Sequence, residues 1–327
     1  MSGRPALEVA RPRPSIAALG GGTGLASALR GLKHHPCELT AIVTVADDGG
    51  SSGRLRRELG ILPPGDIRNC LVALADDESM LSQLFQHRFS DGDLSGHSFG
   101  NLFLAALTEV TGNFDLAIAE CSRVLRIRGR VLPTTLEEIA INGVKADGTV
   151  VRGESALTGT PGACRRVWLE PPNVAAHLPA LGAIASADLL LLGPGSLFTS
   201  VLPHLSIPEI VQAVTYTGAL RVYICNVMTQ PGETDGMSAA DHLACVVDAA
   251  PGAVDAVLVH DGPLDPAALE AYRRNGQEPV NLDGLEDLGV RVVRADLAMA
   301  GNHVRHDPPR LAQAIFALAR EASARWP

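Results

Sequence analysis

Short apolar runs alternate with segments of helical periodicity along most of the chain. Residues 15–19 and 41–46 are apolar enough to form buried strands, whereas the segment between them has apolar residues at helical spacing, namely Leu25, Ala28, Leu29 and Leu32. Further apolar runs, with helical segments between them, follow at residues 187–192, 221–225, 256–260 and 290–294. This alternation indicates an α/β fold with a Rossmann-like, doubly wound and mainly parallel sheet.

The period changes between about residues 127 and 171. Short runs of alternating apolar and polar residues are split there by Asn142-Gly143 and Asp147-Gly148, which are hairpin signals in such a context. We therefore expect a small β-rich insertion within a single domain that covers residues 15–327. Residues 1–14 contain several Arg and Pro residues and are expected to form a disordered tail.

The first glycine-rich turn directly follows the first expected strand. Glycine lets the backbone turn tightly and approach an anion, and the first turn of the following helix offers unpaired N–H groups. The dinucleotide fingerprint does not fit, because its third glycine would fall on Leu25, and no Gly-Lys-Ser/Thr of a P-loop follows. The turn predicts a phosphate or nucleotide site, with a purely structural turn as the alternative. Its candidate ligand-binding residues are Gly21, Gly22, Thr23 and Gly24.

Small and polar residues also occupy several later turns, most of them after predicted strands. Because ligands of parallel sheets bind outside the carboxyl ends of the strands, we expect these turns to form one cleft. Two structural alternatives stay open, since Asp66 is placed to cap a helix and Arg54 to pair with nearby carboxylates. The candidate binding residues in these turns are Asp47, Asp48, Ser51, Ser52, Arg54, Asp66, Asn69, His97, Asn101, Gly193, Gly195, Ser196, Thr199, Ser200, Asn226, Thr229 and Gln230.

Composition excludes several classes of protein. The 327 residues are 46% hydrophobic, which allows a large core, and they carry a net charge of −9, whereas nucleic-acid-binding proteins normally show a basic surplus. The six cysteines are scattered without a C-x-x-C pair, which is typical of reduced cytoplasmic thiols. No apolar run approaches the length of a membrane span. We expect a cytoplasmic protein without nucleic-acid partners and without membrane insertion.

Six segments together resemble the YvcK-type gluconeogenesis factors of the CofD-like superfamily, which is named for 2-phospho-L-lactate transferase. The resemblance runs from about residue 15 to residue 314 through GGGTGLASALRGLK, TAIVTVADDGGSSGRLR, PPGDIRNCLVALA, GHSFGNLFLAAL, LLGPGSLFTSVLP and CNVMTQPGET. It implies a cytoplasmic protein that binds UDP-sugars of the UDP-N-acetylglucosamine type and acts in cell shape and envelope synthesis. Tyr272 and Arg305 fall in segments similar to the UDP-sugar contacts of these factors. A regulatory protein of the cell envelope and a homo-oligomer are the further partners that we consider.

The resemblance leaves catalysis open, and we assign no catalytic residue. The transferase branch moves a phospholactyl group onto a deazaflavin with a divalent metal, and under this alternative Asp47 and Asp48 would bind Mg²⁺. The segment GGSSGRL that follows this pair is instead similar to the factor branch. A third hypothesis is an NAD-type oxidoreductase, because Asp47 stands about where a ribose-binding carboxylate is expected, although the glycine spacing argues against it.

Overall fold

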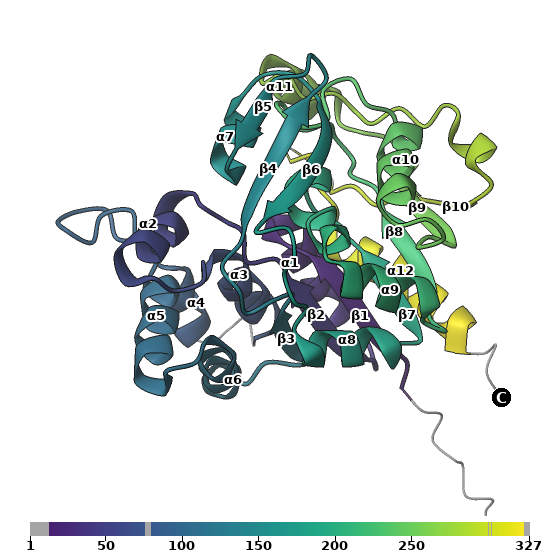
Figure 1. Ribbon diagram of the computed structural model, residues 1–327. Helices are drawn as coiled ribbons and strands as arrows, with labels where there is room; N and C mark the ends of the chain where they lie inside the picture. The colour runs from purple at the N-terminus through teal and green to yellow at the C-terminus, as the bar shows by residue number, and fades with distance from the viewer. Residues whose placement is uncertain (1–12, 76–79, 300, 302, 324–327) are drawn as a thin grey trace, which may run out of the picture.

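The computed structural model describes residues 13–75, 80–299, 301 and 303–323. A seven-stranded parallel sheet lies at the centre, with helices on both faces, and a three-stranded antiparallel sheet stands beside it (Figure 1). The predicted α/β, doubly wound fold is therefore confirmed. Most of the predicted tail, residues 1–14, lies outside the described residues.

The strand order of the main sheet is β10-β9-β8-β7-β1-β2-β3. Ala18 at the centre of β1 lies opposite Ala41 of β2 and Leu191 of β7, so this strand is flanked on both sides and buried along most of its length. Strands covered on both faces are typically continuous apolar runs, which is why six of the seven could be predicted. The strands are β1 (Ser15–Gly20), β2 (Glu38–Val43), β3 (Arg130–Pro133), β7 (Leu189–Leu192), β8 (Leu220–Ile224), β9 (Ala256–His260) and β10 (Arg291–Ala295).

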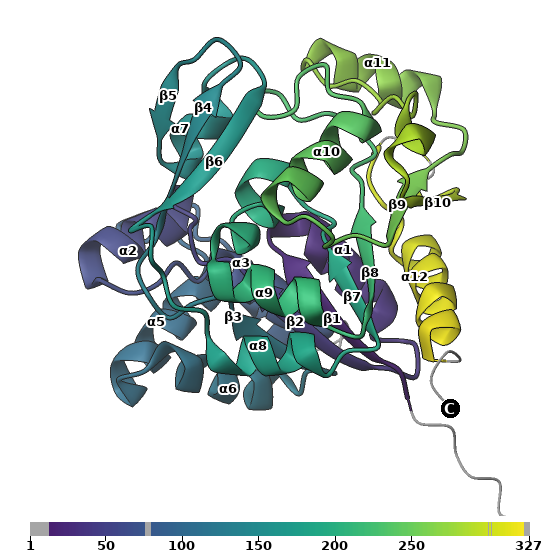
Figure 2. The ribbon, with the colours of Figure 1, turned by 45° about the vertical axis from the view of Figure 1, so that its right-hand side comes forward.

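The helices form two layers because the chain changes direction after β3. Right-handed crossovers place the helices between β1 and β3 on one face, and the helix that leads into β7 and those between β7 and β9 on the other. The C-terminal helix α12 (Pro308–Ser323) returns to the first layer, where Gly31 of α1 lies against Pro308 (Figure 2). The first layer contains α1 (Gly22–Leu32), α3 (Gly65–Leu74) and α6 (Phe114–Leu125); the second contains α8 (Leu178–Ala185), α9 (Pro208–Tyr216) and α10 (Ala239–Ala249).

The remaining helical segments lie around these two layers. Helices α2, α4 and α5 lie in the long connection between β2 and β3, and α11 follows β9 (Figure 1). Among the described residues, no helix is long and apolar enough to cross a membrane. The segments are α2 (Gly50–Leu59), α4 (Met80–Gln86), α5 (Phe99–Thr111), α11 (Pro266–Arg274), the π-helical turn η1 (Leu197–Val201) and the short 3₁₀ turns η2 (His204–Ser206) and η3 (Leu285–Leu288).

The small sheet has the order β5-β4-β6 and carries a short helix, α7 (Glu154–Gly159). Its strands are β4 (Ala140–Lys145), β5 (Val150–Arg152) and β6 (Cys164–Glu170). The β-rich insertion is thus narrower than predicted, because the strand at residues 130–133 joins the main sheet beside β2. Asp147-Gly148 forms the expected turn, whereas Asn142-Gly143 lies inside β4 and pairs with both neighbouring strands.

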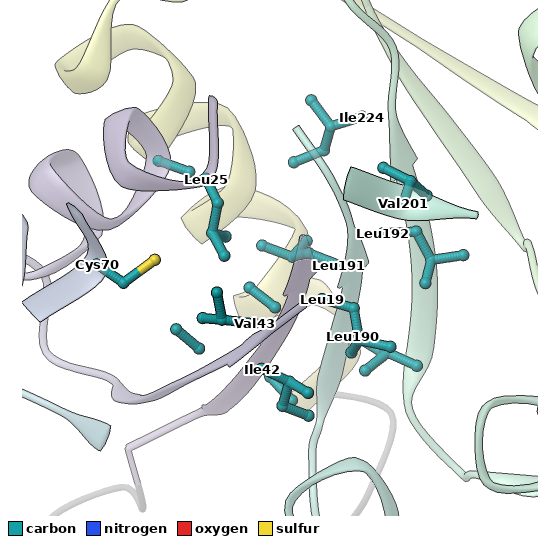
Figure 3. Close-up of a cluster of buried hydrophobic side chains, with 14 of the residues drawn as sticks. Leu19, Leu25, Ile42, Val43, Cys70, Leu190, Leu191, Leu192, Val201 and Ile224 are labelled. Carbon is teal, nitrogen blue, oxygen red and sulfur yellow. The ribbon is translucent and has the colours of Figure 1, made fainter. Parts of the chain in front are cut away.

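The core packs the apolar side chains of the central strands against both helix layers. Leu19 of β1 and Val43 of β2 lie beside Leu191, while Leu25 of α1 and Cys70 of α3 approach them from the first layer (Figure 3). All of these side chains are fully buried. All six cysteines are free, as the sequence predicted.

Candidate functional site

The centre of the main sheet is a topological switch point. β1 connects outward to β2 on one side, whereas its other neighbour, β7, begins the second half of the sheet. The two connections that leave β1 and β7 therefore diverge, and a crevice opens between their first residues. These residues are the predicted glycine turns at 21–24 and 193–196.

The two glycine turns touch each other. A Cβ atom added to Gly24 would lie only 2.9 Å from the nitrogen and Cα of Gly195, so the backbones meet without an intervening side chain. Gly22 has a φ of +61°, a conformation that favours glycine. Helix α1 begins here without a side-chain cap, and the Gly22 N–H is directed to the carboxylate of Asp66. The later N–H groups of the first turn have no capping side chain.

The second turn is organised by a buried carboxylate. Ser196 caps η1 by accepting the Thr199 N–H at 3.1 Å, and its hydroxyl donates to Glu233. The Thr199 hydroxyl in turn donates to Ser196 at 2.9 Å. Burial raises the pKa of Glu233, although its hydrogen bonds with Ser196 and the Phe198 N–H act in the opposite direction. The hydroxyl hydrogens of Thr199 and Ser196 are therefore both used in a series of hydrogen bonds that ends at the Glu233 carboxylate.

A cleft of about 620 Å³ lies above the two turns. This volume falls in the range of small-molecule sites. The cleft brings together twelve of the predicted binding residues: Gly21, Gly22, Thr23, Gly24, Gly195, Ser196, Thr199, Ser200, Asn226, Gln230, Tyr272 and Arg305.

The other residues that line the cleft are not among the predicted ligand-binding residues. Glu154 and Thr158 belong to α7, which no periodicity predicted, and Val227 and Val304 are apolar residues within polar loops. A position after a strand was the available signal, and it applied to Pro194 after β7 and to Glu233 after β8. The additional lining residues are Ser27, Glu154, Thr158, Pro194, Val227, Met228, Glu233, Asn275, Gln277, Val304 and His306.

One end of the cleft lies against α11 and a small apolar cluster. Tyr272 packs on this cluster, which is formed by Val227, Met228, Ala268, Ala298 and Val304. Arg305 is exposed beside it, while His306 is buried. Burial, with a smaller contribution from His260, lowers the pKa of His306 to about 4, so this imidazole is neutral near pH 7.

The loop after β8 crosses between the two ends of the cleft. Asn226 donates to Gln230 at 3.1 Å, and both residues line the cleft. Thr229 is buried and does not line it, because its hydroxyl accepts the Glu278 N–H at 2.9 Å and its own N–H donates to the Glu278 carbonyl. Thr229 therefore fixes the loop to the segment that follows α11.

Comparison with known proteins places this architecture in a family. The family model described as 2-phospho-L-lactate transferase CofD matches residues 16–298. The chain belongs to the CofD family. It is 48% identical to the gluconeogenesis factor of Halalkalibacterium halodurans over 309 residues, which cover 93% of this chain and 96% of that protein. It is 46% identical to the gluconeogenesis factor of Bacillus subtilis over 314 residues, with coverage of 94% and 99%.

Solved structures of relatives show the same fold. A crystal structure of a UPF0052 family member from Bacillus halodurans superimposes with a TM-score of 0.90 at 48% sequence identity. The match covers 93% of this chain and 99% of that one. The architecture of the CofD-family chain is thus shared over nearly its full length.

In this CofD-family chain, Asp47 and Asp48 accept hydrogen bonds from backbone N–H groups. Both oxygens of Asp48 accept backbone N–H groups at the start of α7, from Glu154 at 3.0 Å and Ser155 at 2.9 Å. Asp47 accepts the N–H of Gly49 at 2.9 Å. Within the described part of the chain, no group of three or more His, Cys, Asp or Glu side chains is arranged to hold a metal ion. Asp47 and Asp48 therefore do not fit as a ready-made Mg²⁺ site.

Carboxyl groups gather where α7 meets the glycine turn. Burial, and next the charge of Asp47, raises the pKa of Asp66 to about 6. Burial, followed by the charges of Asp47, Asp66 and Asp48, raises the pKa of Glu154 to about 8. Glu154 is therefore mainly protonated and uncharged at neutral pH. Asp66 does not cap its own helix α3, whose N-cap is Pro64; its carboxylate accepts the Gly22 N–H at the start of α1 instead.

The other predicted residues lie beside the cleft and join α2, α3 and α5. The Ser51 hydroxyl lies 3.1 Å from Nδ1 of His97, and burial, with the charge of Arg54 next, lowers the pKa of His97. Arg54 donates to the Ser95 carbonyl at 2.7 Å, and the Asn69 side chain accepts from Arg68 at 2.6 Å. Ser51, Ser52, Arg54, Asn69, His97 and Asn101 do not line the cleft, and neither do Gly193, Thr229, Asp47, Asp48 and Asp66.

Proposed function

We propose that this chain is a nucleotide-sugar-binding gluconeogenesis factor whose ligand is of the UDP-N-acetylglucosamine type. The observation that carries the proposal is the contact between the two glycine turns at the switch point of the sheet. Backbone N–H groups at the start of a helix attract phosphate through direct hydrogen bonds and through the helix dipole. The diphosphate would lie on the first turn of α1 and on the backbone at Gly195.

The flanks of the cleft suit the rest of a nucleotide. Arg305 is exposed at the cleft and would form a charge-assisted bond with a phosphate oxygen. Tyr272 rests on the apolar cluster at the α11 end, where its ring would stack on the base. We propose that occupancy of this cleft controls a cytoplasmic interaction with a regulatory protein of the cell envelope, and thereby cell shape and envelope synthesis.

A transferase is the second candidate, and the description of the family model favours it. This alternative calls for a divalent metal at Asp47 and Asp48, and their arrangement does not fit one. We rank this function second because Asp48 is committed to α7 and because the hydroxyls of Ser196 and Thr199 are directed to Glu233.

Calorimetric titration with UDP-N-acetylglucosamine tests the proposed function. We expect a saturable heat with wild-type protein and a loss of affinity of about tenfold or more for Arg305→Ala, which removes a charge-assisted bond. An assay with Mg²⁺, a guanylyl phospholactate donor and a deazaflavin acceptor should show no turnover. Absence of heat with every UDP-sugar, from a protein that circular dichroism shows to be folded, would reject the proposal; turnover would establish the transferase.

A further inference from the structure

The cleft has two chemically unlike ends. Tyr272, Val227 and Val304 line the end at α11, whereas Glu154 and Thr158 of α7 line the other. Helices α7 and α11 lie apart (Figure 2). A ligand whose middle part rests on the glycine turn would therefore extend toward one helix with one end and toward the other helix with its other end.

The loop after β8 separates these two ends. Gly232 lies against the carbonyl of Thr158 on the α7 side, and Pro231 lies beside Gly276, just beyond α11. Buried Lys145 holds the first of these contacts, because its ammonium group donates to the carbonyls of Leu157 and Gly232. The α7 end is thus a defined wall of the cleft and is fixed to the main domain.

The α11 end is suited to a flat, weakly polar ring. Its floor consists of buried Val227, Met228 and Val304, and Tyr272 packs on them. Asn275 and Gln277 add amide groups at the edge. An aromatic face over an apolar floor with a few polar groups at the rim is the usual setting for a heterocyclic base.

The α7 end has the opposite character, since it is crowded with carboxyl groups. Glu154 interacts electrostatically with Asp47, Asp48, Asp66 and Glu233. A further negative charge placed here would be repelled, and an apolar ring would find little apolar surface. A group with several hydroxyls and no charge fits this end, because carboxyl oxygens accept hydrogen bonds from hydroxyls. The Thr158 hydroxyl, which donates to the Ser155 carbonyl at 3.1 Å, accepts from them as well.

Resting on the nucleotide-sugar function proposed above, we infer that the α7 end is the sugar subsite of the cleft. Glu154 and Thr158 contact hydroxyls of an uncharged hexose, while the nucleoside lies against Tyr272. The charges of Asp47, Asp48 and Asp66 around the uncharged Glu154 exclude a uronic acid. The insertion that carries α7 is therefore the element that determines which sugar nucleotide is bound.

Four probes test this inference by calorimetry at neutral pH: UDP, UDP-glucose, UDP-N-acetylglucosamine and UDP-glucuronate. We expect UDP-glucuronate to bind about tenfold or more weakly than both neutral sugar nucleotides. Glu154→Ala should weaken UDP-N-acetylglucosamine about tenfold and change UDP by less than about twofold, because only the sugar contact is lost. The variant keeps the backbone N–H that Asp48 accepts, so α7 stays attached.

A second variant and a control keep the test independent of folding. Thr158→Val removes a hydroxyl from an exposed residue of the same helix and should affect UDP-N-acetylglucosamine selectively, as Glu154→Ala does. Glu109→Gln, on the exposed surface of α5, should leave all four affinities unchanged.

Two results would show that the subsite is wrong while the proposed function stands. In the first, UDP binds, but both α7 variants lower the affinities for UDP and UDP-N-acetylglucosamine equally or leave them unchanged. In the second, UDP-glucuronate binds as tightly as UDP-glucose. If none of the four probes binds to wild-type protein, the function itself fails and the subsite with it.

Discussion

Asp48 accepts the backbone N–H of Ser155 at 2.9 Å and thereby joins segments 107 residues apart in the sequence. Its second oxygen accepts the N–H of Glu154 at 3.0 Å. The Asp48 carboxylate therefore holds the small sheet and α7 at the cleft. Under the transferase alternative, the same carboxylate was expected to bind Mg²⁺.

Asp48→Ala should lower the free energy of unfolding by about 2–3 kcal/mol, because two hydrogen bonds to an ionised group are lost. Asp48→Asn should cost less, since its amide oxygen still accepts one N–H. Urea unfolding monitored by circular dichroism measures both. Wild-type stability of Asp48→Ala in the absence of metal, combined with loss of Mg²⁺ binding, would assign Asp48 to a metal site instead.

The contact between the two glycine turns makes Gly24 intolerant of a side chain. In Gly24→Ala the added Cβ would lie 2.9 Å from the backbone of Gly195, so the two turns must move apart. We expect affinity for UDP-sugars to fall about tenfold or more, measured by calorimetry.

Gly182→Ala is the matched control for this substitution. Gly182 is exposed in α8, and a Cβ there meets no atom within 4 Å. This variant should gain about 0.5–1 kcal/mol of stability from helix propensity and keep full affinity. Unchanged affinity in Gly24→Ala would contradict the account of the cleft.

Binding should depend on pH through Glu154. Its pKa is raised to about 8, so the group is uncharged at neutral pH and becomes a carboxylate at the proposed sugar subsite, in the cleft that holds the negatively charged ligand, as the pH rises through that value. Affinity for a UDP-sugar should fall about tenfold between about pH 7 and about pH 9. Glu154→Gln, which stays uncharged, should lose this dependence; an equal decrease in the variant would show that another group is responsible.

The pH dependence of folding stability should also reflect the titration of Glu154. A carboxyl whose folded-state pKa is raised from 4.5 to about 8 binds its proton more tightly in the folded protein. The folded state then holds more protons than the unfolded state across this window, so stability falls as the pH rises from 4.5 to about 8. Thermal unfolding of Glu154→Gln should show a smaller decrease over this range, and a slope equal to that of wild type would contradict the assignment.

Lys145 should be essential for the insertion. It is 1% exposed and donates to the carbonyls of Leu157 at 2.7 Å, Gly162 at 3.2 Å and Gly232. Lys145→Met fills much of the same volume but leaves these carbonyls without their donor, which should cost about 3 kcal/mol or more. Urea unfolding tests this, and a loss below about 1 kcal/mol would show that water replaces the ammonium group.

Much of the main sheet could be predicted because its strands are continuous apolar runs followed by glycine-rich turns. β3 could not be assigned correctly, because Arg130 to Pro133 is a short edge strand whose partner is set by tertiary contact with β2. Asn142-Gly143 carries a turn signal but lies inside β4, where pairing with β5 and β6 overrides the local preference.

The candidate site was predictable only where local sequence fixes its position. The glycine turns follow strands directly, so their convergence follows from the sheet. The links of Asp48 with α7 and of Ser196 with Glu233 join residues 107 and 37 positions apart, and no local pattern encodes such pairs. His97, in the turn before α5, forms a polar contact with Ser51 of α2 beside the cleft. The small and polar residues of this turn would look the same in a ligand site, so the sequence does not separate the two.

The central claim is that the paired glycine turns bind a diphosphate. A crystal structure of the protein with UDP-N-acetylglucosamine tests it most directly. We predict phosphate oxygens within hydrogen-bonding distance of the backbone N–H groups at the start of α1 and at Gly195. A ligand bound elsewhere, with these N–H groups contacting solvent alone, would contradict the account.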